Sequence, residues 1–462
     1  MNHLNYGSRG HRAGSLRNRR IASGFALSAL AALTALLSNS GAAAAAPASA
    51  AASIPQTDCF WTARMDSKFS TDPQRNYAFP DTGAVYWSAQ INMPAGSKIV
   101  LKGQYSHSRY QSINAYNATS NTPTDALNDV STKPDAGSSN PFVAGARRDG
   151  KKRSYTITIL NEPAPANRAP NTIYAGVAGQ TGQALMYRVY EPEPFTVKEL
   201  TGGVGLPAAT LQLADGTTLA GQAACGALQA KSGLLPLIKL PESLYKAIRE
   251  PADASPTFPA AAKPVFRAFY SIPWVTSCWY GGQCNGSPAR AGGQYSNIDN
   301  QYVAAFVSRG FAAGPVLVLK GKLPTTAKTG PKITKMGKGQ LRYWSICQNE
   351  SLYTTKGAGC LYDSQIPVDK KGNYTIITSL AADRPKNATA KCRVGYVPWP
   401  TAGDGAGHLK DGLLLIRNML PASNFREAIQ NTKIPGDEAK VMGSYLPTGS
   451  YTTKKQFEKK GC

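Results

Sequence analysis

The sequence has few histidines and no motif of a common enzyme class. It contains four histidines in 462 residues, and only His107 and His408 follow residue 50. It lacks a G-x-S-x-G nucleophile elbow, an H-E-x-x-H metal motif, a phosphate-binding P-loop and a dinucleotide fingerprint. Two histidines leave few bases for a serine-hydrolase triad. These absences weaken enzymatic interpretations, although two carboxylates that meet only in the folded chain leave no sequence pattern.

The cysteines form no C-x-x-C pair, which argues against a thioredoxin-like redox centre and against haem attachment. They also lack the paired short spacings of zinc sites, so no metal is expected at them. An even number of cysteines is typical of disulfide-bonded exported proteins. All eight follow residue 50: Cys59, Cys225, Cys278, Cys284, Cys347, Cys360, Cys392 and Cys462.

The first fifty residues have the order of a secretory signal peptide. Five arginines without an acidic residue precede an apolar run, 21–37, and an alanine-rich stretch follows. We expect cleavage near Ala50. The Arg19-Arg20 pair leaves both the general and the twin-arginine export routes open. No later stretch reaches the roughly 18 apolar residues of a membrane span, so the sequence predicts a soluble exported protein of the periplasm or the extracellular space.

Acidic residues are scarce. The chain has 51 basic and 27 acidic residues, and the predicted signal contains five of the basic and none of the acidic ones, which leaves a net charge of +19. Such a surface favours anionic partners. The basic residues are scattered, with short runs only at 151–153 and 454–460. We therefore expect an anionic or carbohydrate ligand and no specific binding of nucleic acid.

After the signal, the sequence repeats itself with offsets of 218 to 240 residues. Arg188 aligns with Arg417, and five short segments match in the same order: 99–103 with 317–321, 109–113 with 342–346, 127–129 with 361–363, 155–157 with 374–376, and 205–207 with 445–447. A common order of this kind indicates duplication. We infer two units, residues 57–226 and 275–462, joined by a linker, 227–274, with a helix near 234–250.

The duplication also constrains the disulfides. Cys59-Phe60-Trp61 resembles Cys278-Trp279-Tyr280, and the last cysteine of each unit closes it. The duplication therefore predicts two equivalent disulfides, Cys59–Cys225 and Cys278–Cys462. The remaining cysteines would then form Cys347–Cys360 and Cys284–Cys392.

Both units consist of short segments rich in Val, Ile, Tyr, Thr and Leu, several of which alternate polar and apolar residues as half-buried strands do. The expected strands cover 98–102, 153–160, 183–190, 316–320, 373–380 and 412–419. Turn-forming residues separate them at 135–141 and 369–372. We expect a mainly β protein, a tandem duplication of an antiparallel β-sandwich or jelly-roll-like domain, with short helices near 234–250 and 424–430.

In each unit an apolar strand is followed by Arg-Tyr-x-Ser, a turn, a Tyr-Thr-Ile strand, a loop with asparagine, and a strand with Arg188 or Arg417. This order resembles the jelly-roll domain of unknown function at the C-terminus of a widespread exported bacterial family. Segment 293–302 is similar to stretches of uncharacterised secreted proteins of actinobacteria and proteobacteria. The resemblance covers most of the chain after the signal. It implies export and a β fold but no chemistry.

Six positions carry the same polar type in both units: Arg109/Arg342, Tyr110/Tyr343, Ser112/Ser345, Asp129/Asp363, Asp135/Asp369 and Arg188/Arg417. Because guanidinium groups bind carboxylate or phosphate bidentately, these arginines and tyrosines are candidate ligand-binding residues. The alternative, which we favour, is that each unit needs the same internal Arg–Asp pair to fold, since a buried charge has to be paired.

Other candidates occur once. His107, beside Arg109 and Tyr110, is a candidate acid or base together with Asp129, or a histidine of a surface loop. Ca²⁺ is a candidate cofactor, because five residues offer side-chain oxygen ligands: Asp125, Asn128, Asp129, Asp135 and Asn140. Their spacing does not match an EF-hand, however, and such residues also fill turns. Six tryptophans suggest sugar stacking or core packing, with the Trp279 loop expected to be exposed: Trp61, Trp87, Trp274, Trp279, Trp344 and Trp399.

Three functions remain open from the sequence. The first is a non-enzymatic exported protein that binds an anionic or carbohydrate ligand, and we favour it. The second is a hydrolase or lyase that acts on polysaccharide, with His107, Arg109, Tyr110 and nearby aspartates at its centre. The third is a structural protein of the cell envelope. Fold by itself does not decide between them.

Overall fold

The structure is a computed structural model that describes residues 59–70, 72–238 and 240–462. The predicted signal peptide, 1–50, lies outside the described residues. The described residues belong to one compact unit. None of their helices is long and apolar enough to cross a membrane.

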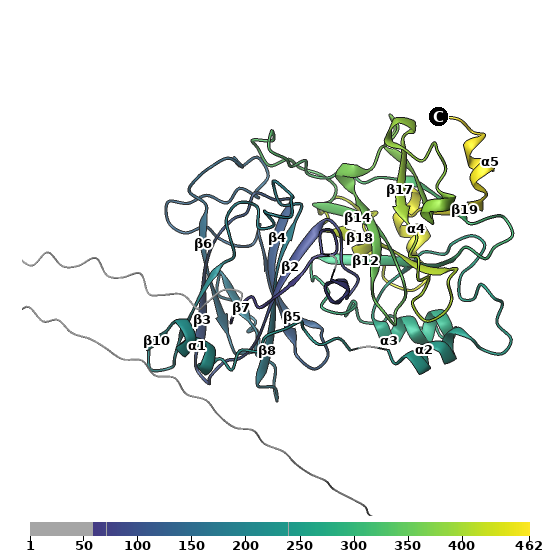
Figure 1. Cartoon of the computed structure of the whole chain (residues 1–462). Coiled ribbons are helices and arrows are strands. Elements are labelled where there is room, and N and C mark those ends of the chain that lie inside the picture. The colour runs from purple at the N-terminus through teal and green to yellow at the C-terminus, as the bar shows by residue number, and fades with distance from the viewer. Residues whose placement is uncertain (1–58, 71, 239) are drawn as a thin grey trace, which may run out of the picture. The chain divides into compact units, whose positions relative to one another are not determined.

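The first half of the described chain contains two sheets of five strands each (Figure 1). All neighbouring strands are antiparallel except β6 and β7, which are parallel. One sheet has the order β1 (Ala63–Met65), β2 (Ala84–Asn92), β8 (Gly182–Tyr190), β4 (Tyr110–Asn117), β5 (Pro123–Asn128). The other has the order β10 (Thr218–Leu219), β9 (Ala208–Gln212), β3 (Lys98–Gln104), β6 (Ser154–Leu160), β7 (Thr172–Tyr174).

The second half has the same strand order, and again a single neighbouring pair, β16 and β17, is parallel. Only β10 has no counterpart among the described strands. One sheet has the order β11 (Arg267–Ala268), β12 (Asn300–Ser308), β18 (Asp411–Met419), β14 (Tyr343–Asn349), β15 (Gly357–Tyr362). The other has the order β17 (Val394–Pro398), β16 (Asn373–Ser379), β13 (Val316–Lys322), β19 (Thr448–Thr452).

Strand register repeats as well. Arg188 lies opposite Ser112, and Arg417 lies opposite Ser345. Tyr155 covers Gly103 so closely that a Cβ there would lie 2.6 Å from the phenol ring, and a Cβ at Gly321 would lie 2.6 Å from the hydroxyl of Tyr374. Glycine therefore follows Leu-Lys in both β3 and β13, because a side chain at Gly103 or Gly321 would collide with the tyrosine opposite. The predicted duplicated, mainly β fold and all six predicted strands are confirmed.

The alternation of side chains along each strand decides what it packs against. Along β8, one face fills the core between the two sheets of the first half with Leu185, Tyr187 and Val189. The opposite face contributes Met186 and Tyr190 to an apolar cluster that also contains Tyr343, Tyr362 and Met419 of the second half. A second core lies between the sheets of the second half. Strands β4, β8, β14 and β18 are buried on both faces because a cluster lies on each side.

The second half begins earlier than its sequence suggested. Arg267 lies opposite Ala304 as Ala63 lies opposite Ser88, so strand β11 falls inside the predicted linker. The expected linker helix is α2 (Glu242–Arg249). Near 424–430 only a 3₁₀ turn, η6 (Ile429–Asn431), forms. The remaining short helices are α1 (Gly221–Ala227), α3 (Ile272–Val275), which continues into the π-helical turn η2 (Thr276–Tyr280), α4 (Glu438–Met442) and α5 (Lys454–Glu458).

Two of the four predicted disulfides are confirmed, Cys59–Cys225 and Cys347–Cys360. The predicted pairs Cys278–Cys462 and Cys284–Cys392 are wrong, because Cys278 pairs with Cys284 and Cys392 with Cys462. The error follows from the start of the second half. Cys278 comes after β11, whereas Cys59 comes before β1, so the two cysteines are not equivalent.

Candidate functional site

The arginines shared by the two halves form ion pairs between the halves. Arg109 Nη1 of the first half lies 2.7 Å from Asp363 Oδ1 of the second, and Arg342 Nη1 of the second half lies 2.9 Å from Asp129 Oδ1 of the first. Arg109 also contacts Glu191 at 3.3 Å. The expectation of an Arg–Asp pair internal to each unit is therefore wrong. Each half supplies an arginine for the aspartate of the other.

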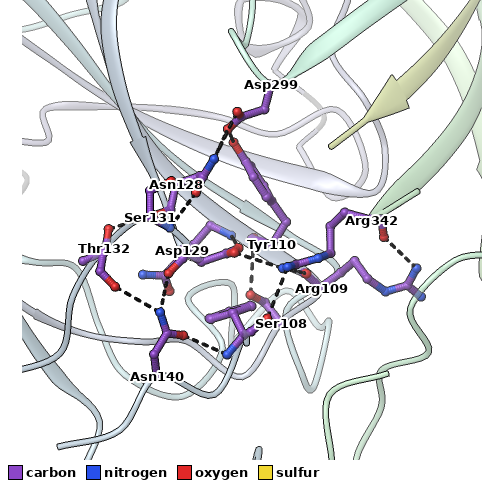
Figure 2. A network of polar contacts seen from close by, with 12 residues as sticks. Ser108, Arg109, Tyr110, Asn128, Asp129, Ser131, Thr132, Asn140, Asp299 and Arg342 are labelled. Carbon is purple, nitrogen blue, oxygen red and sulfur yellow. Dashed lines mark hydrogen bonds and ion pairs between the residues drawn. The ribbon is translucent and has the colours of Figure 1, made fainter. Parts of the chain in front are cut away.

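Backbone contacts hold both aspartates in place. Asp129 Oδ2 accepts the N–H of Gln111 at 2.9 Å, and Asp363 Oδ2 accepts the N–H of Trp344 at 3.0 Å. Asn140 donates to the backbone oxygen of Asp129 (Figure 2). With their arginines and these N–H groups, both carboxylates are engaged by the protein itself, which indicates a structural role for Arg109, Asp129, Arg342 and Asp363.

The paired tyrosines also bond across the halves. Tyr110 donates its hydroxyl to Asp299 Oδ2 at 2.6 Å, and Tyr343 donates to Asp81 Oδ1 at 2.9 Å. Asn128 donates to Asp299 as well (Figure 2). The candidate ligand-binding hydroxyls of Tyr110 and Tyr343 are thus occupied by carboxylates that sequence reasoning did not select.

Burial of Asp129 has a consequence for pH dependence. Loss of solvation raises the pKa of Asp129 from 3.8 to about 6, and the nearby Arg342 opposes this shift. The folded protein therefore binds this proton more tightly than the unfolded chain. The contribution of Asp129 to the free energy of unfolding is greatest below pH 4 and falls by about 3 kcal/mol as the pH rises through 6. Denaturant titrations between pH 4 and 7 should show a shallower decline for Asp129→Asn than for the wild type, and parallel curves would contradict this.

His107 does not form an acid–base pair. Its Nε2 lies 2.5 Å from Nη1 of Arg153, and no carboxylate of the described residues is within hydrogen-bond distance of its ring. Burial, together with the charge of Arg153, lowers the pKa of His107. Of the residues proposed for a hydrolase or lyase, Arg109 and Asp129 are engaged in ion pairs between the halves and His107 contacts Arg153.

The five candidate calcium ligands bind other groups of the protein or belong to turns. Asp125 binds Arg168 and the N–H of Tyr174, Asn128 binds Asp299, and Asp135 and its counterpart Asp369 belong to turns. Two other groups of metal-ligating side chains occur among the described residues. In one, Asp81 lies beside the disulfide-bonded Cys347 and Cys360. In the other, each side chain has a protein partner: Asp404 binds His408, His408 also binds Glu250, and Asp411 binds Arg249.

All six tryptophans are buried, so none offers an exposed face to a sugar. In the loop expected to be exposed, Gly281 and Gly282 are exposed, but the expectation is wrong for Trp279 itself. Trp279 is 7% exposed and packs edge-on against Phe269 and Phe306. The π-helical turn η2 directs the ring of Trp279 toward Phe306 of strand β12. The two glycines that follow had instead indicated an exposed turn.

The two remaining candidates, Arg188 and Arg417, line a cavity of about 60 Å³ between the halves. They lie on the face of β8 and β18 that points away from each core. Arg188 lies 5.7 Å from the ring of Tyr86, and Arg417 lies 5.8 Å from the ring of Tyr302. Each arginine also donates to a backbone oxygen of the other half, Arg188 to Tyr295 and Arg417 to Phe79.

The pseudo-symmetry of the cavity breaks at one pair of positions. Ala84 lies opposite Tyr190 and Asn300 opposite Met419, each two residues beyond its arginine, so Ala84 corresponds to Asn300. Counting back three residues, Asp81 corresponds to Asn297. Arg417 has Asp81 at 3.4 Å. The position that corresponds to Asp81 thus carries an amide, Asn297, which bonds to the hydroxyl of Tyr110.

Arg188 is a buried cation, and the charge of Asp299 acts on it only from beyond salt-bridge distance. Its Nη1 donates to Asn114 Oδ1 at 2.5 Å, and among the residues that the structure describes no carboxylate is within salt-bridge distance. Burial by itself lowers the pKa of Arg188, but the surrounding tyrosines, Tyr116 and Tyr190 foremost, leave it above its ordinary value. The guanidinium is therefore charged.

The cavity can hold more than a single water molecule. About 10–15 Å³ measured in this way is enough for one water, so 60 Å³ accommodates several waters or a small organic molecule. Its lining includes Ala78, Gly293 and Tyr302, which are only half-buried. The other lining groups are tyrosine rings, apolar side chains such as Met186, Phe269 and Leu415, and a few uncharged polar side chains. This arrangement can bind an anion.

No family model and no curated protein matches the chain. Two solved structures are similar to it. An uncharacterised protein from Burkholderia cenocepacia is 11% identical, with 84% of this chain and 81% of that chain covered and a TM-score of 0.44. The VPA0106 protein from Vibrio parahaemolyticus is 10% identical, with 81% and 90% covered and a TM-score of 0.39. Because both TM-scores are below 0.5, neither likeness assigns a fold or a function, and the resemblance to the exported jelly-roll family stays a prediction.

Proposed function

We propose that this protein binds a small organic anion in the cavity between its two halves, with the anion on the guanidinium of Arg188. One observation carries the proposal: two buried guanidinium groups line the cavity, and only Arg417 has a carboxylate in salt-bridge distance among the described residues. A buried charge without a partner is costly. A bound carboxylate supplies at Arg188 what Asp81 supplies at Arg417.

The dimensions and lining favour a small monocarboxylate. The cavity leaves room for a few heavy atoms beyond the carboxylate, and Tyr86, Tyr190 and Tyr302 surround it with ring faces. A neutral sugar would leave Arg188 unpaired, so within the class of anionic or carbohydrate ligands the anion is favoured.

We place this activity outside the cytoplasm, in the periplasm or beyond the cell. Four disulfides among the described residues suit an oxidising compartment. The basic, apolar and alanine-rich order of the first fifty residues supports export.

The proposal is tested by calorimetry with acetate, lactate, benzoate and phosphate on the wild type and three variants. Arg188→Gln is expected to weaken the best-bound carboxylate about 10- to 100-fold, because it removes a charge-assisted hydrogen bond. Asn297→Asp is expected to weaken binding, because it places a carboxylate in the cavity lining at the position that corresponds to Asp81, where it competes with the anion for Arg188. The exposed Arg147→Gln is the control and should bind like the wild type.

Two results would overturn the proposal. One is a wild-type protein that none of the four anions binds. The other is an affinity that survives both Arg188→Gln and Asn297→Asp, which would place the anion elsewhere. Thermal unfolding of Asn297→Asp and Arg188→Gln is measured in parallel, so that loss of binding by a folded variant is distinguished from unfolding.

A further inference from the structure

A long loop of the second half is fixed against a loop of the first. The segment 324–341 connects β13 to β14, and it pairs with the segment 143–152 through backbone hydrogen bonds of 2.8–2.9 Å that involve Gly145, Ala146, Arg148, Thr334 and Met336. The side chain of Met336 is 3% exposed and belongs to the core of the first half. The two loops therefore form one surface of defined geometry.

This surface, which we call the paired-loop surface, concentrates positive charge. Only one acidic residue occurs in the two segments, Asp149, and it is bound by Arg147. None of the lysines there forms an ion pair or a side-chain hydrogen bond with the described residues. Seven exposed cations share it: Arg147, Lys151, Lys152, Lys328, Lys332, Lys335 and Lys338.

More basic groups lie beneath. Arg148 and Arg153 are buried under the same loops, and of the two only Arg148 has an acidic partner, Glu193 at 2.5 Å. Burial and the charge of Arg148 lower the pKa of Arg153. Isolated lysines on a surface are ordinarily just solvated. Here the anchoring of Met336 holds two like-charged loops together, and their mutual repulsion falls when a polyanion neutralises them.

The chemistry of the loops favours one type of polyanion. Loops that enter a membrane surface carry tryptophan, phenylalanine or leucine, and proteins that bind single-stranded nucleic acid stack bases on aromatic rings. The two segments contain no aromatic residue, and their one leucine, Leu341, is 1% exposed. Their uncharged polar side chains are those of threonines and of Gln340. An extended chain with one negative charge per sugar requires neither insertion nor stacking.

We propose that the paired-loop surface binds a linear acidic polysaccharide through its lysines. This site is separate from the cavity at Arg188 and independent of the proposed function. The pairing of the two loops brings together cations that are far apart in the sequence.

The test is the binding of fluorescent polygalacturonate to the full-length exported protein at low and at physiological ionic strength. A variant with Lys328, Lys332, Lys335 and Lys338 all changed to glutamine is expected to bind about tenfold more weakly. The matched control changes four exposed lysines elsewhere to glutamine, Lys98, Lys198, Lys433 and Lys440. It removes the same net charge and is expected to bind nearly as the wild type. Affinity of the wild type should fall as salt rises.

Equal weakening in both variants would overturn the proposal, since net charge alone would then account for binding, and so would an unchanged affinity in the paired-loop variant. Vesicles containing phosphatidylglycerol and single-stranded DNA are measured in parallel, and tighter binding to either would overturn the assignment to polysaccharide. Thermal unfolding should show the same midpoint for both variants. Arg188→Gln should bind polygalacturonate normally, which separates this site from the proposed anion site.

Discussion

Replacing Arg109 with methionine is expected to lower the free energy of unfolding by about 3–5 kcal/mol, because it leaves buried carboxylates without their cation. The Arg109 side chain is 2% exposed and contacts both Asp363 and Glu191. Methionine fills a similar volume, so the loss reports the charge and not a cavity. Denaturant unfolding followed by tryptophan fluorescence measures it, since both halves contain tryptophans.

The control for Arg109 is Arg147→Met. Arg147 also forms an ion pair, with Asp149, but both side chains are exposed, and pairs of this kind contribute about 0–1 kcal/mol. A second measurement, Arg109→Met combined with Asp363→Asn, should restore part of the lost stability, because one uncompensated charge is removed. If Arg109→Met were no more destabilising than Arg147→Met, the pairs between the halves would not be structural.

Changing both Cys59 and Cys225 to serine is expected to lower the free energy of unfolding by about 5 kcal/mol, because this disulfide closes the longest loop and restricts the unfolded chain most. The two cysteines are 166 residues apart and tie the start of the first half to helix α1. Unfolding in denaturant without reductant measures the difference.

The matched comparison is the double change of Cys278 and Cys284 to serine. These cysteines are only six residues apart, and the same loop-entropy relation gives about 2 kcal/mol. The order of the two losses is the informative result. A larger loss for the short loop would show that local packing, and not restriction of the unfolded chain, dominates the contribution of these disulfides.

The reciprocal contacts explain why a site can lie between the halves at all. Arg109, Arg342, Tyr110 and Tyr343 each bind a carboxylate of the other half, which fixes the outer faces of β8 and β18 against each other. Duplication produces such pairs twice. The two copies differ where Asn297 corresponds to Asp81, and of the two arginines only Arg417 has a carboxylate of the described residues within salt-bridge distance.

Much of this protein was determined by local patterns in the sequence. The alternation of residues 154–160 sets which side chains face a core, because successive side chains on a strand point to opposite faces. The shared order of segments fixed the duplication, and it correctly paired Cys59 with Cys225, which close the first half. These features depend on neighbours along the chain or on equivalent positions in a repeat, so the sequence contains them in full.

Only the tertiary structure decided which shared residues meet. Arg109 could pair with an aspartate of its own half or of the other, and the sequence is the same in both cases, because an ion pair depends on position in space and not on spacing along the chain. The same holds for the burial of Trp279, for Cys278 and its partner, and for Arg188. The sequence alone does not show that Arg188 lacks the carboxylate that Arg417 has. Strand register is needed to show that Asn297 corresponds to Asp81.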